Sequence, residues 1–151
     1  MFRGHSLRSL DPKGRLMLPP DFRETILDRS PDGKIMVTNF DGCVVGYPMA
    51  EWERIEESFG QINFLNRKLR DFHRFFISGA VEVVLDKQGR ILVPPHLREY
   101  AKLNREIALA GVGKKFEIWD RGHFEAQRAK MEENFDNVMD SLAENGFELR
   151  I

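Results

Sequence analysis

Apolar and polar positions follow the same order twice along this chain. Residues 10–24 (LDPKGRLMLPPDFRE) return as residues 85–99 (LDKQGRILVPPHLRE), with eight identical positions and mostly apolar-for-apolar exchanges at the others. The similarity continues beyond both segments. This repeat predicts a tandem duplication, and because two copies are too few for a solenoid, we expect the halves to intertwine around one core with a pseudo-two-fold axis.

Each copy predicts the same local elements. Asp at the first position and Gly at the fourth are typical of a type I turn, and an aliphatic strand follows each turn. A pair of prolines ends that strand, and its second member can open a helix. Apolar segments on either side of a glycine-containing turn then predict a β-hairpin. The predicted elements, first copy before second, are turns at 11–14 and 86–89, strands at 15–18 and 90–93, helices at 20–27 and 95–101, and hairpins at 34–47 and 106–119.

Apolar residues at helical spacing close each copy. In the first copy they recur every three or four residues from Trp52 to Phe76, with Gly60 as a break or kink. A comparable stripe runs from Phe124 to Leu142. Such a stripe is typical either of a helix that packs on the core or of a helix at a subunit interface, and the pattern alone leaves both open.

Composition and charge narrow the class of protein. The chain has 151 residues, 42% of them hydrophobic, and a single cysteine, Cys43, so an ordered domain without intrachain disulfides is expected. No apolar run is long enough to cross a membrane and the first residues lack a secretory signal, which predicts a cytoplasmic protein. The net charge of −1 conceals an asymmetry, because residues 1–20 carry four basic side chains against one acidic and residues 131–151 carry one against six. Any nucleic-acid contact must therefore use a local patch.

The sequence lacks the patterns that catalysis or metal binding requires. The four histidines are not spaced as zinc ligands, and Cys43 lies in an apolar strand, where a structural role is expected. Residues 111–114 (GVGK) lack the spacing of a phosphate loop, and a hairpin turn is the better interpretation. We therefore expect no enzyme activity, no metal, no cofactor and no small-molecule substrate.

The repeated turn is the candidate binding site. Lys13 at its tip and Arg15 just beyond bring cations to one side, and a guanidinium can grip a phosphate or bridge the O6 and N7 atoms of guanine. Lys87 and Arg90 repeat the arrangement. An alternative stays open, in which the aspartate of each turn only pairs with the following arginine to close the turn. Because Arg15 shares its strand face with Met17, either another element covers this face or the arginine lies at the mouth of the strand.

Together these motifs resemble the MraZ family. The resemblance rests on the opening MFRG, the doubled LDxxGR, the YPMAEWE of residues 47–53 and the FEIWD of residues 116–120. This family belongs to the AbrB-like superfamily, whose shared motif is DxxxR. The resemblance implies an α+β fold, mainly an antiparallel double-split (swapped-hairpin) β-barrel of the AbrB/MazE/MraZ type, built from two tandem βαββ-like halves with helical caps. We expect the halves at residues 1–77, with closing helices, and 78–151, with a C-terminal helix.

The resemblance also implies a function. Members of the family are transcriptional regulators of the bacterial division and cell-wall gene cluster, and they bind direct repeats in promoter double-stranded DNA as ring-shaped homo-oligomers. By this analogy the chain is cytoplasmic and nucleoid-associated. The alternative is an antitoxin-like or scaffold module of the same fold, whose partner is another protein. Because Gln88 stands in place of Lys13, the sequence leaves open whether both copies contact DNA equally. The expected DNA-binding residues are Arg3, Arg8, Lys13, Arg15, Lys87 and Arg90, and those expected to shape the turns are Asp11, Gly14, Asp86 and Gly89.

Overall fold

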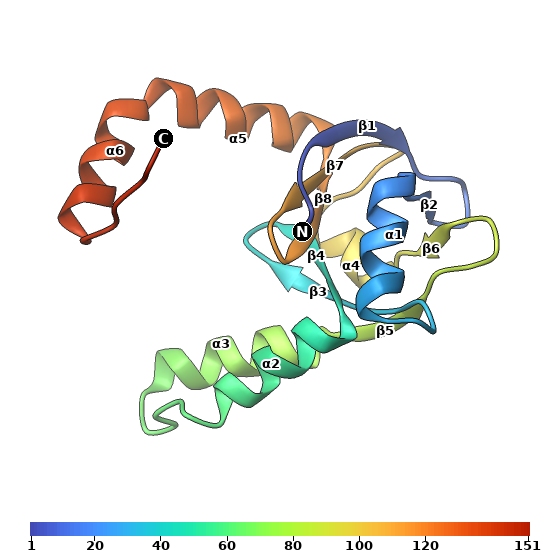
Figure 1. Ribbon diagram of the computed structural model, residues 1–151, viewed down its shortest axis with the longest axis horizontal. Coiled ribbons are helices and arrows are strands. Elements are labelled where there is room, and N and C mark those ends of the chain that lie inside the picture. Colours follow the sequence, from blue (N-terminus) through green and yellow to red (C-terminus); the bar gives the residue numbers. More distant parts are fainter. The chain divides into compact units, whose positions relative to one another are not determined.

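The computed structural model describes residues 1–151, which form two compact units. The unit Met1–Asp120 combines a six-stranded antiparallel sheet, a two-stranded antiparallel ladder and four helices (Figure 1). The unit Arg121–Ile151 contains the helices α5 (Arg121–Glu133) and α6 (Phe135–Glu144). The elements of the first unit are β1 (His5–Ser9), β2 (Arg15–Met17), α1 (Pro20–Arg29), β3 (Lys34–Phe40), β4 (Cys43–Pro48), α2 (Met49–Phe59), α3 (Arg67–Ser78), β5 (Val81–Val84), β6 (Arg90–Leu92), α4 (Pro95–Tyr100), β7 (Glu106–Val112) and β8 (Lys115–Asp120).

Strands of both halves contribute to one sheet. Its order is β1-β7-β8-β4-β3-β5, so exchanging the two halves reproduces the same order from the other end. β1 pairs with β7 and β5 pairs with β3, which means that the first strand of each half joins the hairpin of the other half. β4 and β8 meet in the middle of the sheet. The two halves are therefore intertwined.

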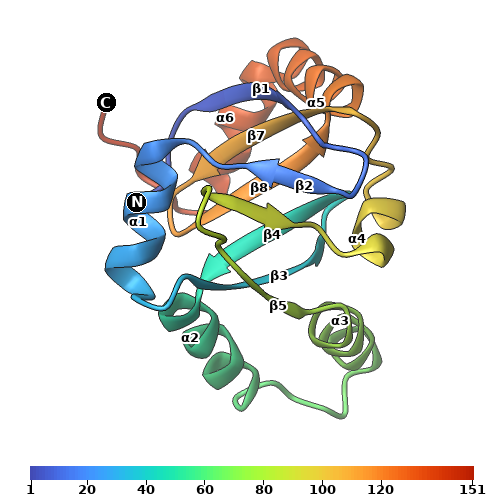
Figure 2. The same cartoon turned by 90° about the vertical axis from the view of Figure 1, so that its right-hand side faces the viewer.

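The remaining two strands are those that follow the repeated turns. β2 and β6 lie side by side as an antiparallel ladder (Figures 1 and 2). The cross-strand partners are Arg15 and Leu92, Leu16 and Ile91, and Met17 and Arg90. No strand pairing joins this ladder to the six-stranded sheet, so the strands do not close into a barrel. The expected α+β fold with antiparallel strands is confirmed, whereas the barrel is not.

Each half begins with a strand that the sequence analysis did not predict. β1 and β5 are the two edges of the sheet, and their side chains alternate between exposed and half-buried. The β1 segment HSLRS contains no β-branched residue, so its pairing with β7 decides its conformation. The boundaries of the halves at 1–77 and 78–151 stay a prediction.

The aliphatic residues after the turns point into a shared core. The nearly inaccessible ones are Leu16, Leu18, Ile91 and Val93. Phe116 on β8 is also fully buried, and it packs on its cross-strand partner Gly46 of β4. An ideal Cβ on Gly46 would lie only 2.3 Å from the ring of Phe116. Glycine therefore interrupts the otherwise apolar β4 because the ring occupies the space of a side chain.

The predicted helical stripe is divided between two helices. Gly60 follows α2 as its C-cap, and α3 begins where the side chain of Asn66 accepts a hydrogen bond from the N–H of Leu69 (3.2 Å). α2 and α3 project together from one edge of the first unit (Figure 1). Gly60 therefore ends a helix rather than bending one.

The stripe is partly core and partly surface. Trp52, Phe59 and Phe76 are buried in an aromatic cluster, with the rings of Trp52 and Phe76 stacked at 5.5 Å between centroids. Leu65 and Leu69, by contrast, expose 89% and 38% of their surface. The core interpretation therefore holds for one part of the stripe, and the other part is exposed in the single chain.

Candidate nucleic-acid interface

The first repeated turn is closed by its own aspartate. Asp11 Oδ1 accepts hydrogen bonds from the backbone N–H groups of Lys13 (2.9 Å) and Arg15 (2.8 Å), and Asp11 Oδ2 accepts one from Arg15 Nε (2.5 Å). The N–H of Gly14 donates to the Asp11 carbonyl (2.9 Å), and Gly14 has a φ of +86°, which favours glycine. One carboxylate therefore holds both the loop and the arginine that follows it.

The second turn repeats this geometry. Asp86 Oδ1 accepts from the backbone N–H groups of Gln88 (2.9 Å) and Arg90 (2.8 Å), and Asp86 Oδ2 accepts from Arg90 Nε (2.9 Å). Gly89 has a φ of +80°. The backbone N–H of the following arginine is the main cause that holds the pKa of both Asp11 and Asp86 below its ordinary value. Both carboxylates are therefore charged at neutral pH.

These ion pairs use only one nitrogen of each guanidinium group. In each turn the aspartate binds Nε, and the terminal nitrogens of Arg15 and Arg90 have no partner in the chain. The terminal nitrogens are also the donors that grip a phosphate or reach a guanine edge. The ion pair that the sequence left as an alternative is present, and it orients each arginine without occupying the whole guanidinium.

Both arginines belong to one surface, which we call the ladder face: Arg15, Met17, Arg90 and Leu92 on the outer side of the β2–β6 ladder. Cross-strand partners and residues two apart share a face, so these four side chains are neighbours. Met17 and Leu92 expose 41% and 50% of their surface, so this face is not covered by another element. Arg15 and Arg90 are the first residues of β2 and β6, so each arginine lies at the end of its strand that adjoins the turn.

Each turn is clamped by an arginine of the other half. The guanidinium of Arg98, from α4, lies against Gly14, and the side chain of Arg23, from α1, lies against Gly89. Each glycine carbonyl also accepts a backbone hydrogen bond from the residue just beyond the other half's strand, at 2.9 and 3.0 Å. The sequence prediction omits Arg23 and Arg98, although their identity in the two copies was a usable signal.

The other predicted cations cover a wider surface. Lys13 and Lys87 are exposed at the tips of their turns. Arg8 on β1 donates from Nη1 to the carbonyl of Met17 (3.3 Å), which links the sheet edge to the ladder. Arg3 lines a separate hollow of about 180 Å³ with Arg8 and the start of α1. The structure therefore brings Arg8 beside the ladder face and places Arg3 at a separate hollow.

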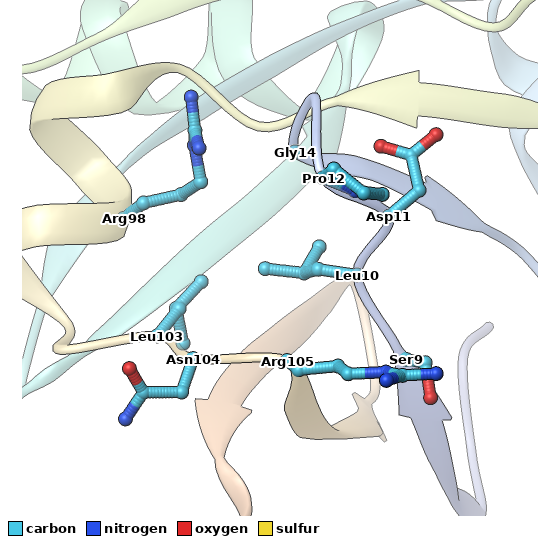
Figure 3. Close-up of a pocket in the computed structure, with 9 residues that line it drawn as sticks. All are labelled: Ser9, Leu10, Asp11, Pro12, Gly14, Arg98, Leu103, Asn104 and Arg105. Atoms are coloured by element: carbon cyan, nitrogen blue, oxygen red, sulfur yellow. The ribbon is translucent and has the colours of Figure 1, made fainter.

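An open cleft of about 560 Å³ adjoins the first turn (Figure 3). Residues 9–12 and Gly14 of the first half line one side, and Arg98 and residues 103–105 of the second half line the other. Because the two sides come from different halves, neither copy of the repeat predicts this cleft by itself.

Two other sequence features have structural roles. Residues 111–114 lie at the β7–β8 turn, which confirms the hairpin interpretation. Cys43 is fully buried, and burial raises the pKa of its thiol, so it stays protonated at neutral pH. The chain contains no group of three or more His, Cys, Asp or Glu side chains placed to hold a metal ion. None of its helices has the length and apolar character needed to cross a membrane.

Comparison of the sequence with protein-family models agrees with the duplication seen in the two turns. The family model described as "MraZ protein, putative antitoxin-like" matches residues 1–75 and matches again at residues 76–145. The chain belongs to the MraZ family. Two successive matches to one MraZ model are what a tandem duplication produces.

Curated MraZ relatives are similar to the chain over almost its whole length. A protein of Solidesulfovibrio magneticus named "Transcriptional regulator MraZ" is 60% identical over 151 residues, covering 99% of each chain. One of the same name from Nitratidesulfovibrio vulgaris is 49% identical over 148 residues, covering 98% of this chain and 97% of the relative. A third, from Pelotomaculum thermopropionicum, is 39% identical over 144 residues, covering 95% and 97%. The MraZ resemblance of the motifs is confirmed.

Proposed function

We propose that this MraZ-family chain is a transcriptional regulator that binds double-stranded DNA in a sequence-specific manner. The ladder face is the observation that carries this proposal, because Asp11 and Asp86 orient Arg15 and Arg90 while leaving their terminal nitrogens free. The names of the relatives agree with a role in transcription. No catalytic step and no cofactor enters this function.

The side chains of the ladder face suit a major groove. Arg15 and Arg90 donate to guanine edges or phosphates, and the exposed Met17 and Leu92 provide apolar contact for a thymine methyl group. Phosphate contacts position the protein, and the remaining predicted cations supply them. Those phosphate-binding residues are Arg3, Arg8, Lys13 and Lys87.

We further propose that several copies act together as a ring. The target is a set of direct repeats in the promoter of the division and cell-wall gene cluster, and the protein is cytoplasmic and nucleoid-associated. One ladder face is a small patch, but identical patches on a ring that meet evenly spaced repeats raise the affinity through effective concentration. The exposed apolar side chains on and before α3, Leu65 and Leu69, are suited to the contact between subunits.

The finer details of the fold belong to the same proposal. Each half, residues 1–77 and 78–151, is one AbrB-like unit, and the two together form a double-split, swapped-hairpin arrangement with helical caps. The exchange of β1 and β5 between the hairpins supports this proposal.

Fluorescence anisotropy tests the DNA contact. The probes are a labelled fragment from upstream of the protein's own gene and a scrambled fragment of equal length, over roughly 50 to 300 mM salt, where phosphate-driven affinity falls steeply. We expect the wild type to prefer the native fragment, and we expect Arg15→Ala to lose that preference while keeping its oligomeric mass. Arg54→Ala is the matched control, because Arg54 is an exposed arginine of α2.

Equal and weak binding of both fragments by the wild type would overturn the proposal. The antitoxin-like or scaffold module would then be the better interpretation, and a stoichiometric protein partner would be sought. An Arg15→Ala variant that dissociates or unfolds would instead assign the arginine to closing the turn.

A further inference from the structure

The two turns of the chain have the same internal hydrogen bonds but different surroundings. The N–H of Leu10 donates to the carbonyl of Arg105 (2.8 Å), and the N–H of Leu85 donates to the carbonyl of Gly33 (2.9 Å). These equivalent bonds identify the matching positions beside each turn. A long cation therefore stands beside the first turn where glycine stands beside the second.

The preceding position differs in charge as well. Asn104 precedes Arg105, whereas Asp32 precedes Gly33. Asp32 accepts hydrogen bonds from the N–H of Lys34 (3.2 Å) and from Ser30 Oγ (3.0 Å), which keep its pKa below the ordinary value, and its Oδ2 also pairs with Lys34 Nζ (3.8 Å). The second turn thus has a charged carboxylate at the place where the first turn has a neutral amide.

The cleft beside the first turn contains two arginine side chains with unused donors. Arg105 is exposed, and its side chain makes no hydrogen bond or ion pair within the chain. Arg98 donates from Nε to the carbonyl of Val93 (3.0 Å), which leaves its terminal nitrogens free. Leu10 and Leu103 lie between the two arginines (Figure 3). Cations on either side of an apolar floor match a sugar–phosphate segment, which has charged phosphates and an apolar sugar.

The one carboxylate that lines the cleft does not oppose an anion there. Both oxygens of Asp11 are occupied by bonds to Lys13 and Arg15, and its carboxylate points away from Arg105 (Figure 3). Glu106, which follows Arg105, is not part of the lining.

We propose that this cleft binds the sugar–phosphate backbone of DNA through Arg105 and the terminal nitrogens of Arg98, so that the first turn of each chain contacts DNA more strongly than the second. The inference rests on the proposed function, since the same DNA must reach the ladder face. The cleft is formed by the first turn and by the connection of the second half that carries Arg105. The second turn has Gly33 at the position that matches Arg105, so it lacks this cation.

The test compares Arg105→Ala with Arg54→Ala and the wild type on the native and scrambled fragments. Both substitutions remove one exposed guanidinium, but only Arg105 lines the cleft. We expect Arg105→Ala to bind both fragments about five- to tenfold more weakly at roughly 100 mM salt. We also expect the slope of log affinity against log salt to become shallower by about 0.9, which corresponds to the loss of one phosphate contact. The ratio of the affinities for the native and the scrambled fragment should stay unchanged. Arg105→Lys should restore most of the affinity, because a lysine also contacts phosphate as a point charge.

The outcomes separate the two proposals. If the wild type prefers the native fragment and Arg105→Ala behaves as Arg54→Ala does, the cleft proposal is overturned and the proposed function stands. If the wild type has no preference, the proposed function fails and the cleft proposal fails with it. Binding of submillimolar inorganic phosphate by the wild type but not by Arg105→Ala, without any displacement of DNA at constant ionic strength, would assign the cleft to a free anion and overturn the DNA assignment.

Discussion

Arg98 of α4 occupies the space beside Gly14 in which any other residue would carry its side chain. An ideal Cβ on Gly14 would lie 2.7 Å from Arg98 Cζ, and an ideal Cβ on Gly89 would lie 2.5 Å from Arg23 Cδ. The turn that carries each candidate DNA-binding arginine therefore depends on the other half of the chain for its support. A substitution at Arg23 or Arg98 in one half should therefore alter the turn that carries the candidate arginine of the other half.

Replacing Gly14 should cost more stability than its backbone conformation alone explains. We expect Gly14→Ala to lower the free energy of unfolding by about 1–3 kcal/mol, from the positive φ and from displacement of Arg98. Gly4→Ala is the matched control, since Gly4 has a φ of +82° and no atom within 4 Å of its ideal Cβ. Urea unfolding measures both variants, and equal losses would show that the packing of Arg98 is not a constraint.

Acid should weaken the fold through Asp11 and Asp86. Their pKa values are lower in the folded protein, so they stabilise it above the unfolded pKa of about 3.9, and this contribution is lost as the pH falls through the folded pKa. Thermal unfolding from about pH 6 to pH 3 checks this for the wild type and for the double variant Asp11→Asn/Asp86→Asn. The double variant should have the lower Tm near pH 6 and a smaller further decrease below about pH 4. Parallel curves would contradict the assignment.

The buried carboxylate of α2 should be coupled to α1. Glu51 is 5% exposed, and its Oε1 accepts a hydrogen bond from Arg29 Nη1. We expect Arg29→Ala to destabilise the protein by about 1–3 kcal/mol, because it leaves a buried carboxylate without its partner. A double-mutant cycle with Glu51→Gln should give a coupling energy of about 1–2 kcal/mol. A coupling energy near zero would mean that solvent replaces Arg29 without cost.

The exposed apolar residues Leu65, just before α3, and Leu69, within α3, should control assembly. Leu65→Glu and Leu69→Glu place charges on a surface that is open in the single chain, so the free energy of unfolding should change by about 0.5 kcal/mol or less. The oligomer should nevertheless dissociate into smaller species, measured by light scattering after size-exclusion chromatography. Lys68→Glu, an exposed position between them, is the control. An unchanged mass in both leucine variants would place the subunit contact elsewhere.

Local chemistry predicts those parts of this molecule that depend only on neighbouring residues. The two DxxxR turns follow from Asp, Gly and the hydrogen bonds that these residues favour, and the short helices follow from proline at the first helical position. β1 (HSLRS) has little strand propensity of its own and forms because β7 of the other half's hairpin supplies its partner, whereas β5 (VEVV) is rich in valine but too short to show which strand it joins. Pairing over such distances along the chain leaves no local signal.

The same contrast between local and long-range contacts explains which site residues can be predicted from the sequence. Arg15 and Arg90 stand beside the aspartates that orient them, so their spacing is sufficient. Arg98 and Arg105 reach the first turn only because the halves are intertwined; the repetition of Arg23 as Arg98 is a signal for the first of them, and the sequence around Arg105 contains none. The closed barrel implied by the family resemblance is not formed, because the β2–β6 ladder pairs with neither edge of the larger sheet.

The exchange of first strands between the hairpins has a consequence for the ancestry of the chain. A solitary half would present a hairpin without its edge strand and an edge strand without its hairpin, and a second copy of itself would satisfy both. The duplicated protein therefore has the architecture of a homodimer fused into one polypeptide. Cutting the connection between α3 and β5, at residues 79–80, should yield two fragments that regain the native circular dichroism spectrum when mixed, whereas each fragment alone should fold only as it pairs with a second copy of itself, so that its spectrum depends on concentration.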